Sequence, residues 1–353
     1  MTQTPPPPSR PLRPEILVAQ LAFTAAVAFA VGQQVLLAPT QPDFTTLWAA
    51  QQTTTPYDVA SLNRILGSDG HWYAYPPTTL ALTWPLKLFA CEPAYLGWTI
   101  LSACALVATL RSVFAPLLLA APAVFLAAIN GQTSLFMGAL LLAAARLEAR
   151  PILAGLLYGL AASLKPQVGL LIPVYLACAG HWRIVLAASA TVAAVAGAAT
   201  LLYGLQAWAD WLAVLPSYVA ANDGAWTHRY ISLPGNWRVA VLIAGAIGAL
   251  AAARRRDTEL GLFICIGAAL LGSLHAMDYD EAILAPFAFS CAQARRRAGL
   301  IFLVPLVFLP GRWPTLALTG LAAADLALRR SAPATPGQAG ATIFPKIKTK
   351  SRK

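Results

Sequence analysis

A single carboxylate follows the first long apolar run of the chain. The run extends from Glu15 to Ala38, and Asp43 comes next, within the stretch QPDFTTLWAA. A charged side chain near a membrane surface is costly and tends to be functional. As a general base, Asp43 could accept the proton of a hydroxyl group that attacks a sugar carbon. The alternative is a structural role, in which Asp43 caps the helix expected to start in this stretch.

Two basic side chains stand between apolar runs and could bind a phosphate group. Lys165, in ASLKPQVGLL, precedes a proline at the expected start of a helix, and both an ammonium group and a helix N-terminus attract anions. His275, in SLHAMDYDEAIL, could bind a phosphate when protonated or relay a proton. The alternative for Lys165 is that it snorkels to the interface. Asp280, in the same stretch as His275, could cap the next helix, but that role does not explain His275.

Amides and aromatic rings complete the candidate site. Asn130 and Gln132, in AINGQTSLF, could bind hydroxyl groups or orient a base, or they could cap two facing helix ends. Tyr75 belongs to an aromatic-rich loop over residues 39–76, whose rings suit either the faces of sugars or the headgroup belt of a membrane. Metal binding would require more ligands at suitable spacing than these motifs supply, so we expect neither a metal nor a cofactor.

The composition indicates how these residues are held. The chain has 353 residues, of which 58% are hydrophobic and 11% charged, and its mean hydropathy is +0.63. A soluble domain is about a quarter charged, so lipid must be the solvent for much of this surface. The apolar runs are rich in Leu and Ala and do not alternate, which favours helices over a barrel. The sequence therefore predicts an all-α polytopic membrane protein.

Charge predicts the topology. The net charge of +11 is better explained by cytoplasmic loops than by nucleic-acid binding. Basic clusters expected on the cytoplasmic side are Arg146/Arg150, Arg254–Arg256, Arg295–Arg297 and Arg329/Arg330. With both termini inside, twelve spans follow: 16–38, 94–110, 114–129, 133–149, 151–164, 168–180, 184–204, 237–253, 258–275, 281–294, 298–310 and 314–328. The segment 77–90 would then be re-entrant or interfacial.

This topology places the polar segments together on the outer face. A single membrane domain over 15–330 is expected between a disordered cytoplasmic arm, 1–14, and a disordered basic cytoplasmic tail, 331–353. Arg229, in the outer loop 205–236, departs from the positive-inside rule and could hold an anionic phosphate, or it could be a solvated charge. A membrane-embedded cavity that is open to the outside would suit a sugar linked through phosphate to a polyprenyl lipid.

The order of short motifs resembles glycosyltransferase family 87. The motifs are DF, WAA, PYD, YPP, NGQ, KPQ, SL.G.WR and a late H followed by YD, and they run from Asp43 to Asp280. The resemblance implies the membrane C-type glycosyltransferase fold, with an outer-face loop between the first two spans. It also implies an inverting reaction, a polyprenyl-phosphate sugar such as mannose as donor, and no required metal. By position it makes Asp43 the base and matches Lys165 and His275 to family motifs.

We therefore expect a hexosyltransferase of the bacterial plasma (inner) membrane that acts at the outer face. Its partners would be the polyprenyl-phosphate donor, membrane lipids and a glycolipid or glycan acceptor, with no nucleic acid. Besides Asp43 as catalytic base, the expected site consists of Lys165, His275 and Arg229 at the donor phosphate, and of Asn130, Gln132, Tyr75 and Asp280 at the sugar or acceptor. The alternatives are a transporter or flippase for a lipid-linked sugar, and a structural subunit of an envelope complex.

Overall fold

The computed structural model describes residues 42–112, 114–222, 230–294, 300–307 and 310–328. Apart from one isolated bridge between Tyr230 and Met277, these residues contain no β-structure, so the all-α prediction is confirmed. The expected arm 1–14, the span 16–38, the tail 331–353 and Arg229 lie outside the described residues.

The described helices range in length from three residues in η5 to 22 residues in α10. In chain order they are α2 (Pro42–Gln51), α3 (Val59–Leu66), α4 (Pro77–Thr83), η1 (Trp84–Leu88), α5 (Cys91–Leu110), η2 (Ala115–Ala120), α6 (Pro122–Ile129), α7 (Ser134–Arg146), α8 (Pro151–Leu164), α9 (Ile172–Cys178), α10 (Trp182–Tyr203), α11 (Gln206–Asn222), α12 (Trp237–Arg255), α13 (Thr258–Gly272), η3 (Asp278–Ile283), α14 (Ala285–Ala294), η4 (Leu300–Leu303), η5 (Pro305–Val307) and α16 (Arg312–Leu328).

The twelve expected spans are not confirmed. Among the described helices, only α5, α10 and α12 are long and apolar enough to cross a membrane. The pair α6 and α7 adds a fourth if it is taken as one span, but its two halves are bent by 120°. Other apolar helices, such as α8 and α13, have 14 and 15 residues, fewer than the roughly 20 needed to cross the hydrocarbon core.

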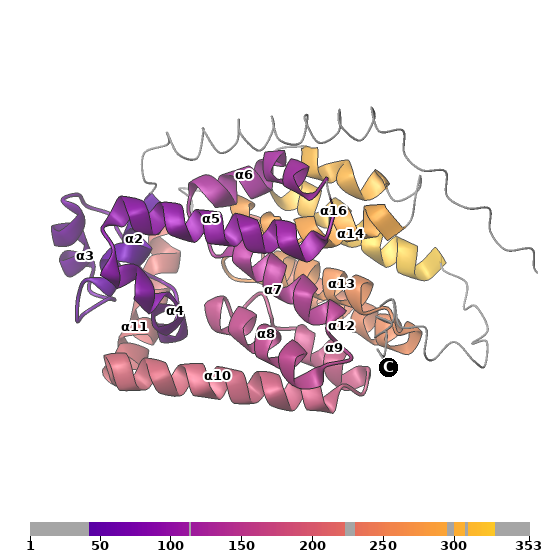
Figure 1. The fold of residues 1–353 in the computed structure, drawn as a ribbon, viewed down its shortest axis with the longest axis horizontal. Coiled ribbons are helices and arrows are strands. Elements are labelled where there is room, and N and C mark those ends of the chain that lie inside the picture. The colour runs from indigo at the N-terminus through magenta and orange to yellow at the C-terminus, as the bar shows by residue number, and fades with distance from the viewer. Residues whose placement is uncertain (1–41, 113, 223–229, 295–299, 308–309, 329–353) are drawn as a thin grey trace, which may run out of the picture.

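The long helices pack around a central layer. Figure 1 shows α5 and α10 along the long axis of the molecule on opposite sides of α7 and α8, and α8 packs extensively on both α7 and α10. The contact between α8 and α10 depends on glycine. A Cβ atom at Gly155 would lie 2.4 Å from the Cβ of Ala187, and one at Gly159 would lie 2.5 Å from the Cβ of Thr191. Small residues thus let the two backbones approach closely, as is common in membranes.

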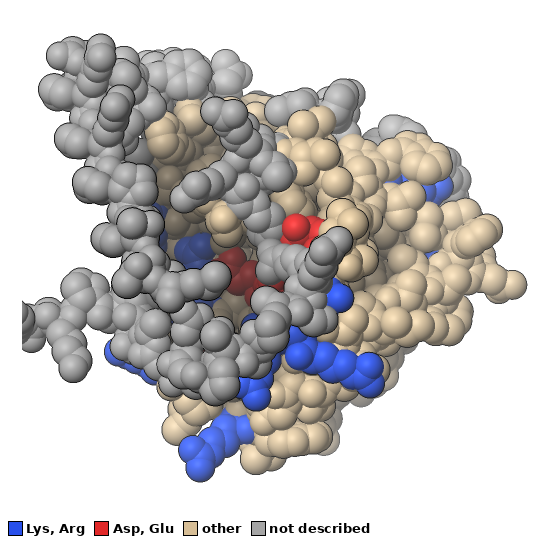
Figure 2. All heavy atoms as spheres, turned by 90° about the vertical axis from the view of Figure 1, so that its right-hand side faces the viewer, with Lys and Arg blue, Asp and Glu red and all other residues tan. Residues whose placement is uncertain are grey.

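One end of the molecule carries the described members of the predicted basic clusters. Helices α7 and α12 end there, at Arg146 and Arg255. Figure 2 looks onto this end and shows Lys and Arg side chains around a smaller group of acidic ones. The Nε atom of Arg146 lies 3.1 Å from Glu259 on α13, and Nη2 donates to Ser290 on α14. The short helices α2, α3 and α4 lie at the opposite end (Figure 1).

Candidate functional site

A cavity of about 480 Å³ lies at the end of the molecule that holds α2. Its walls come from α2, the segment 72–76, the turn 165–170, α11 and the segment 272–280, so residues far apart in the chain meet here. The polar and aromatic side chains that line it include Asp43, Tyr75, Gln132, Lys165, Trp211, Tyr218, His275, Tyr279 and Asp280.

Asp43 stands in the first turn of α2, because that helix begins at Pro42. Its position is set by the residue that follows. Phe44 is fully buried against Tyr95, with ring centroids 5.3 Å apart, and it occupies the space that a side chain at position 131 would need. A Cβ atom on Gly131 would lie 2.7 Å from the Phe44 ring, and Gly131 also has a φ of +60°. Glycine at this turn therefore lets the loop between α6 and α7 contact α2.

Gln132, the next residue in that loop, bonds directly to Asp43. Its Nε2 donates to Asp43 Oδ2 over 2.8 Å, and its Oε1 accepts from the Tyr75 hydroxyl over 2.6 Å and from Lys165 Nζ over 3.4 Å. Gln132 is only 4% exposed. The sequence pattern left open whether this amide orients a base, binds hydroxyl groups or caps a helix, and the geometry places it against the carboxylate.

Lys165 is paired inside the protein. Its ammonium group has three protons to donate, and three acceptors surround it: Asp280 Oδ1 at 2.5 Å, Ser134 Oγ at 3.3 Å and Gln132 Oε1 at 3.4 Å. The Lys165 and Asp280 side chains are 5% and 4% exposed. The ammonium group also lies over the ring of Tyr279, 5.3 Å from its centroid. Such an arrangement compensates for burying two charges.

His275 lies in the segment between α13 and η3, because the helix expected over 258–275 ends at Gly272. Its Nε2 is 2.8 Å from the Tyr218 hydroxyl, and the rings of Tyr218 and Tyr230 meet the imidazole edge to face. Burial, helped by the charge of Lys165, lowers the pKa of His275 to about 4 even though Asp280 acts in the opposite direction. The imidazole is therefore neutral near pH 7 in this structure.

The structure brings most of the predicted residues into one cavity and leaves one out. The cavity wall includes Asp43, Tyr75, Gln132, Lys165, His275 and Asp280. Asn130 is not part of that wall, because its Nδ2 donates to the Leu126 carbonyl at the end of α6. Within the described residues, no group of three or more His, Cys, Asp or Glu side chains could hold a metal ion.

The cavity also has walls that the sequence did not indicate. Trp211 and Tyr218 lie on α11, in a region expected to be a loop over 205–236. Trp211 is fixed by donating from Nε1 to the Ala74 carbonyl over 3.0 Å. Such a contact spans more than a hundred residues of sequence and leaves no local pattern. The segment 206–222 is rich in apolar residues, which favours a helix, but Pro216 inside it argues against a continuous one.

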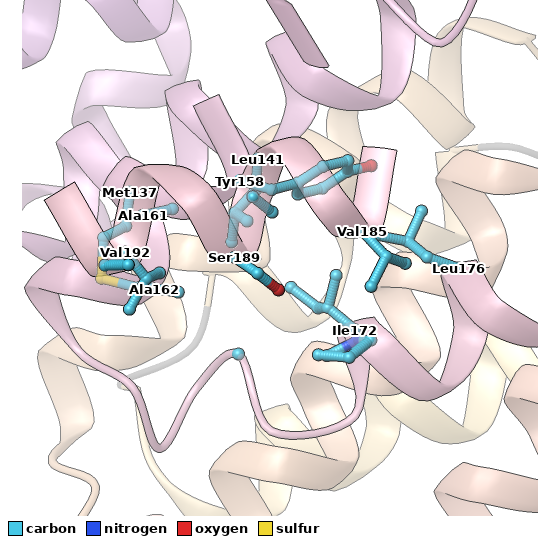
Figure 3. A pocket seen from close by; sticks show the side chains of 14 residues that line it. Met137, Leu141, Tyr158, Ala161, Ala162, Ile172, Leu176, Val185, Ser189 and Val192 are labelled. Atoms are coloured by element: carbon cyan, nitrogen blue, oxygen red, sulfur yellow. The ribbon is translucent and has the colours of Figure 1, made fainter. Parts of the chain in front are cut away.

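A second cavity, of about 340 Å³, lies on the other side of the turn 165–171, between α7, α8, α9 and α10. Figure 3 shows its wall, in which the side chains are almost all apolar, Ile172, Val185 and Val192 among them. The turn forms part of both walls, since Gly169 lines the apolar cavity and Leu170 lines the polar one. A polar site and an apolar groove are therefore neighbours.

These features define a class of protein: an α-helical membrane protein with a buried polar site beside one end of its long helices. Residues 73–277, more than half of the chain, match the family model described as glycosyltransferase family 87. The chain belongs to glycosyltransferase family 87 and is a membrane glycosyltransferase. No curated protein and no solved structure matches it. Lys165 lies inside the matched range, whereas Asp43 and Asp280 lie outside it.

Proposed function

We propose that this protein transfers a hexose such as mannose from a polyprenyl-phosphate donor to a hydroxyl group of a glycolipid or glycan, with Asp43 as the general base. The observation that supports this most is the hydrogen bond from Gln132 to Asp43 Oδ2, which holds a carboxylate at the wall of a membrane-protein cavity. A carboxylate held in this way can accept the proton of an attacking hydroxyl group.

The proposed reaction is a single displacement. The acceptor oxygen forms a bond to the anomeric carbon while its proton passes to Asp43. The bond between the anomeric carbon and the phosphate oxygen breaks, and the polyprenyl phosphate leaves with the electron pair. Because attack occurs on the face opposite the phosphate, the anomeric centre is inverted.

The donor phosphate would be bound by Lys165, His275 and Arg229. All three Lys165 protons already have acceptors, so a phosphate oxygen would replace the longest of those bonds, the one to Gln132 at 3.4 Å. Neutral His275 can donate a hydrogen bond without carrying charge. The apolar cavity beside the turn 165–171 would receive the polyprenyl chain, because its wall is almost all hydrocarbon (Figure 3) and Gly169 of the same turn lines it. The remaining wall residues Tyr75 and Asp280 would contact the sugar or the acceptor.

The orientation proposed for this reaction places the polar cavity at the outer face of a bacterial inner membrane. The basic end shown in Figure 2 would then face the cytoplasm, as the positive-inside rule requires.

The test compares the wild-type protein with Asp43→Asn, both purified into lipid nanodiscs. Each is given radiolabelled polyprenyl-phosphate mannose and an envelope lipid extract, and the label in the extract is counted. Loss of a general base typically lowers the rate by about 10²–10⁴-fold, so we expect the variant to fold normally and transfer almost nothing. Equal transfer by both proteins would exclude Asp43 as the base. Donor that crosses the bilayer of a vesicle unchanged would indicate a transporter instead.

A further inference from the structure

The orientation of the Gln132 amide is determined by its neighbours. Lys165 can only donate hydrogen bonds, so the side of the amide that faces Nζ must be the carbonyl oxygen. The Tyr75 hydroxyl donates to the same oxygen over 2.6 Å. The amide nitrogen is therefore turned to Asp43, 2.8 Å from Oδ2, where it can only donate.

This orientation requires Asp43 Oδ2 to act as an acceptor. A hydrogen bond to the charged form of a carboxyl group favours that form, and it also restricts rotation of the group. Gln132 itself has little freedom, because it is buried and both ends of its amide are bonded. One rigid amide thus connects the carboxylate to the buried pair of Lys165 and Asp280.

We infer that Gln132 is a positioning residue for the reaction, one that holds the Asp43 carboxylate ionised and correctly turned, rather than a residue that contacts the sugar. This inference rests on the proposed role of Asp43 as the base. When an oxygen of the donor phosphate replaces Gln132 as the hydrogen-bond acceptor of Lys165, the bond from Tyr75 still maintains the orientation of the amide. A sugar contact would contribute to donor binding, whereas a positioning residue contributes to the rate of the bound complex.

The first test observes the hydrogen bond without using activity. Infrared spectra of protein labelled with ¹³C-aspartate are recorded for the wild type and Asp43→Asn, and their difference identifies the Asp43 carboxylate band. In Gln132→Met, which roughly keeps the side-chain volume and removes all three hydrogen bonds of the amide, we expect that band to shift. The matched control is Gln51→Met, because Gln51 is equally buried and hydrogen-bonded but lies outside the cavity wall. A band that stays in place in Gln132→Met overturns the inference.

The second test uses kinetics with polyprenyl-phosphate mannose as donor. Loss of a hydrogen bond to an ionised group typically lowers a rate by about tenfold or more. We therefore expect kcat to fall about 10- to 100-fold in Gln132→Met, with KM for the donor nearly unchanged. A rise in KM at constant kcat would overturn the inference and assign Gln132 to sugar binding. If the infrared band moves but the wild type transfers no sugar, the hydrogen bond stands and the proposed function fails.

A compensating pair of substitutions separates positioning from general damage to the fold. Gln132→Asn withdraws the amide by one methylene group, and Asp43→Glu extends the carboxylate by one. We expect each single variant to lose activity and the double variant to exceed both by about tenfold, because the two changes restore the span of the bond. A double variant that is no better than the worse single one contradicts the inference.

Discussion

At the scale of single residues, Lys165 and Asp280 form a buried ion pair in the wall of the cavity. Removing two charges from water is expensive, and the pair compensates only because its geometry is good and its other bonds are made. Asp280 accepts from Lys165 and Ser134 through Oδ1 and from the Met277 backbone through Oδ2. The carboxylate therefore holds η3 and α7 together as well as balancing the ammonium group.

Asp280→Asn tests the cost of breaking this pair. The variant leaves the Lys165 ammonium group buried without its anion, which typically costs about 3–5 kcal/mol. We expect a clear fall in the unfolding temperature in detergent. Lys165→Met combined with Asp280→Asn should recover part of that loss, because no unpaired charge remains.

Glu92→Gln provides the control for loss of a carboxylate. Glu92 is exposed in the first turn of α5, so its neutralisation should change the unfolding temperature little. If Asp280→Asn were as stable as Glu92→Gln, the pair could not be a stabilising element of the site.

That several of these polar residues would meet in one cavity could be predicted from the sequence, but their interactions could not. Asp43, Gln132 and Lys165 stand out because polar side chains are rare between apolar runs. That Lys165 is neutralised by Asp280 depends on a contact across 115 positions, and no local pattern encodes it. The sequence therefore suggested a cation ready for phosphate, and the structure shows a cation that already has partners.

At the scale of helices, short elements with polar connections form the site. Helices α6 and α7 meet at the turn that carries Gln132, and α8 and α9 meet at the turn that carries Lys165. The residues of both turns line the cavity, so the irregular backbone there is surrounded by protein rather than by lipid. Irregular backbone is tolerated in membranes under that condition. The start of α8 at Pro151 was predicted from the sequence, whereas α6 begins at Pro122, inside the expected span 114–129. The 120° bend between α6 and α7 also depends on packing that the sequence does not show.

The contact between α8 and α10 offers a prediction at this scale. Gly159→Ala adds a Cβ atom 2.5 Å from the Thr191 Cβ and 2.7 Å from the Ala188 carbonyl oxygen, so the two helices must separate. Overpacking of this kind typically costs about 1–3 kcal/mol, and the unfolding temperature should fall.

Gly197→Ala is the matched control on α10. No atom lies within 4 Å of its added Cβ, and alanine favours a helix over glycine by about 1 kcal/mol. This variant should be as stable as the wild type or more so. Equal destabilisation by both substitutions would mean that the close approach of α8 and α10 does not limit stability.

At the scale of the whole molecule, the described members of the basic clusters and the polar cavity lie at opposite ends. Arg146 and Arg254–Arg256 lie at the end viewed in Figure 2, and the cavity with Asp43 lies beside α2 at the other (Figure 1). The sequence predicted this separation from the positions of the arginines alone. It could not give the number of spans, because re-entrant pairs and true spans have the same apolar composition.

Cysteine labelling tests the orientation that follows from this asymmetry. In a background without the five native cysteines, Thr54→Cys places a thiol in the exposed loop after α2, and Arg150→Cys places one at the exposed turn before α8. A membrane-impermeant maleimide should label position 54 in right-side-out vesicles and position 150 in inside-out vesicles, because arginine-rich loops stay in the cytoplasm. Labelling of both positions in detergent shows that each thiol is reactive. Labelling of both positions from the same side of the membrane would contradict the prediction that the two ends lie on opposite sides. The reverse labelling pattern would place the cavity on the cytoplasmic side, where the acceptor would have to be a cytoplasmic molecule.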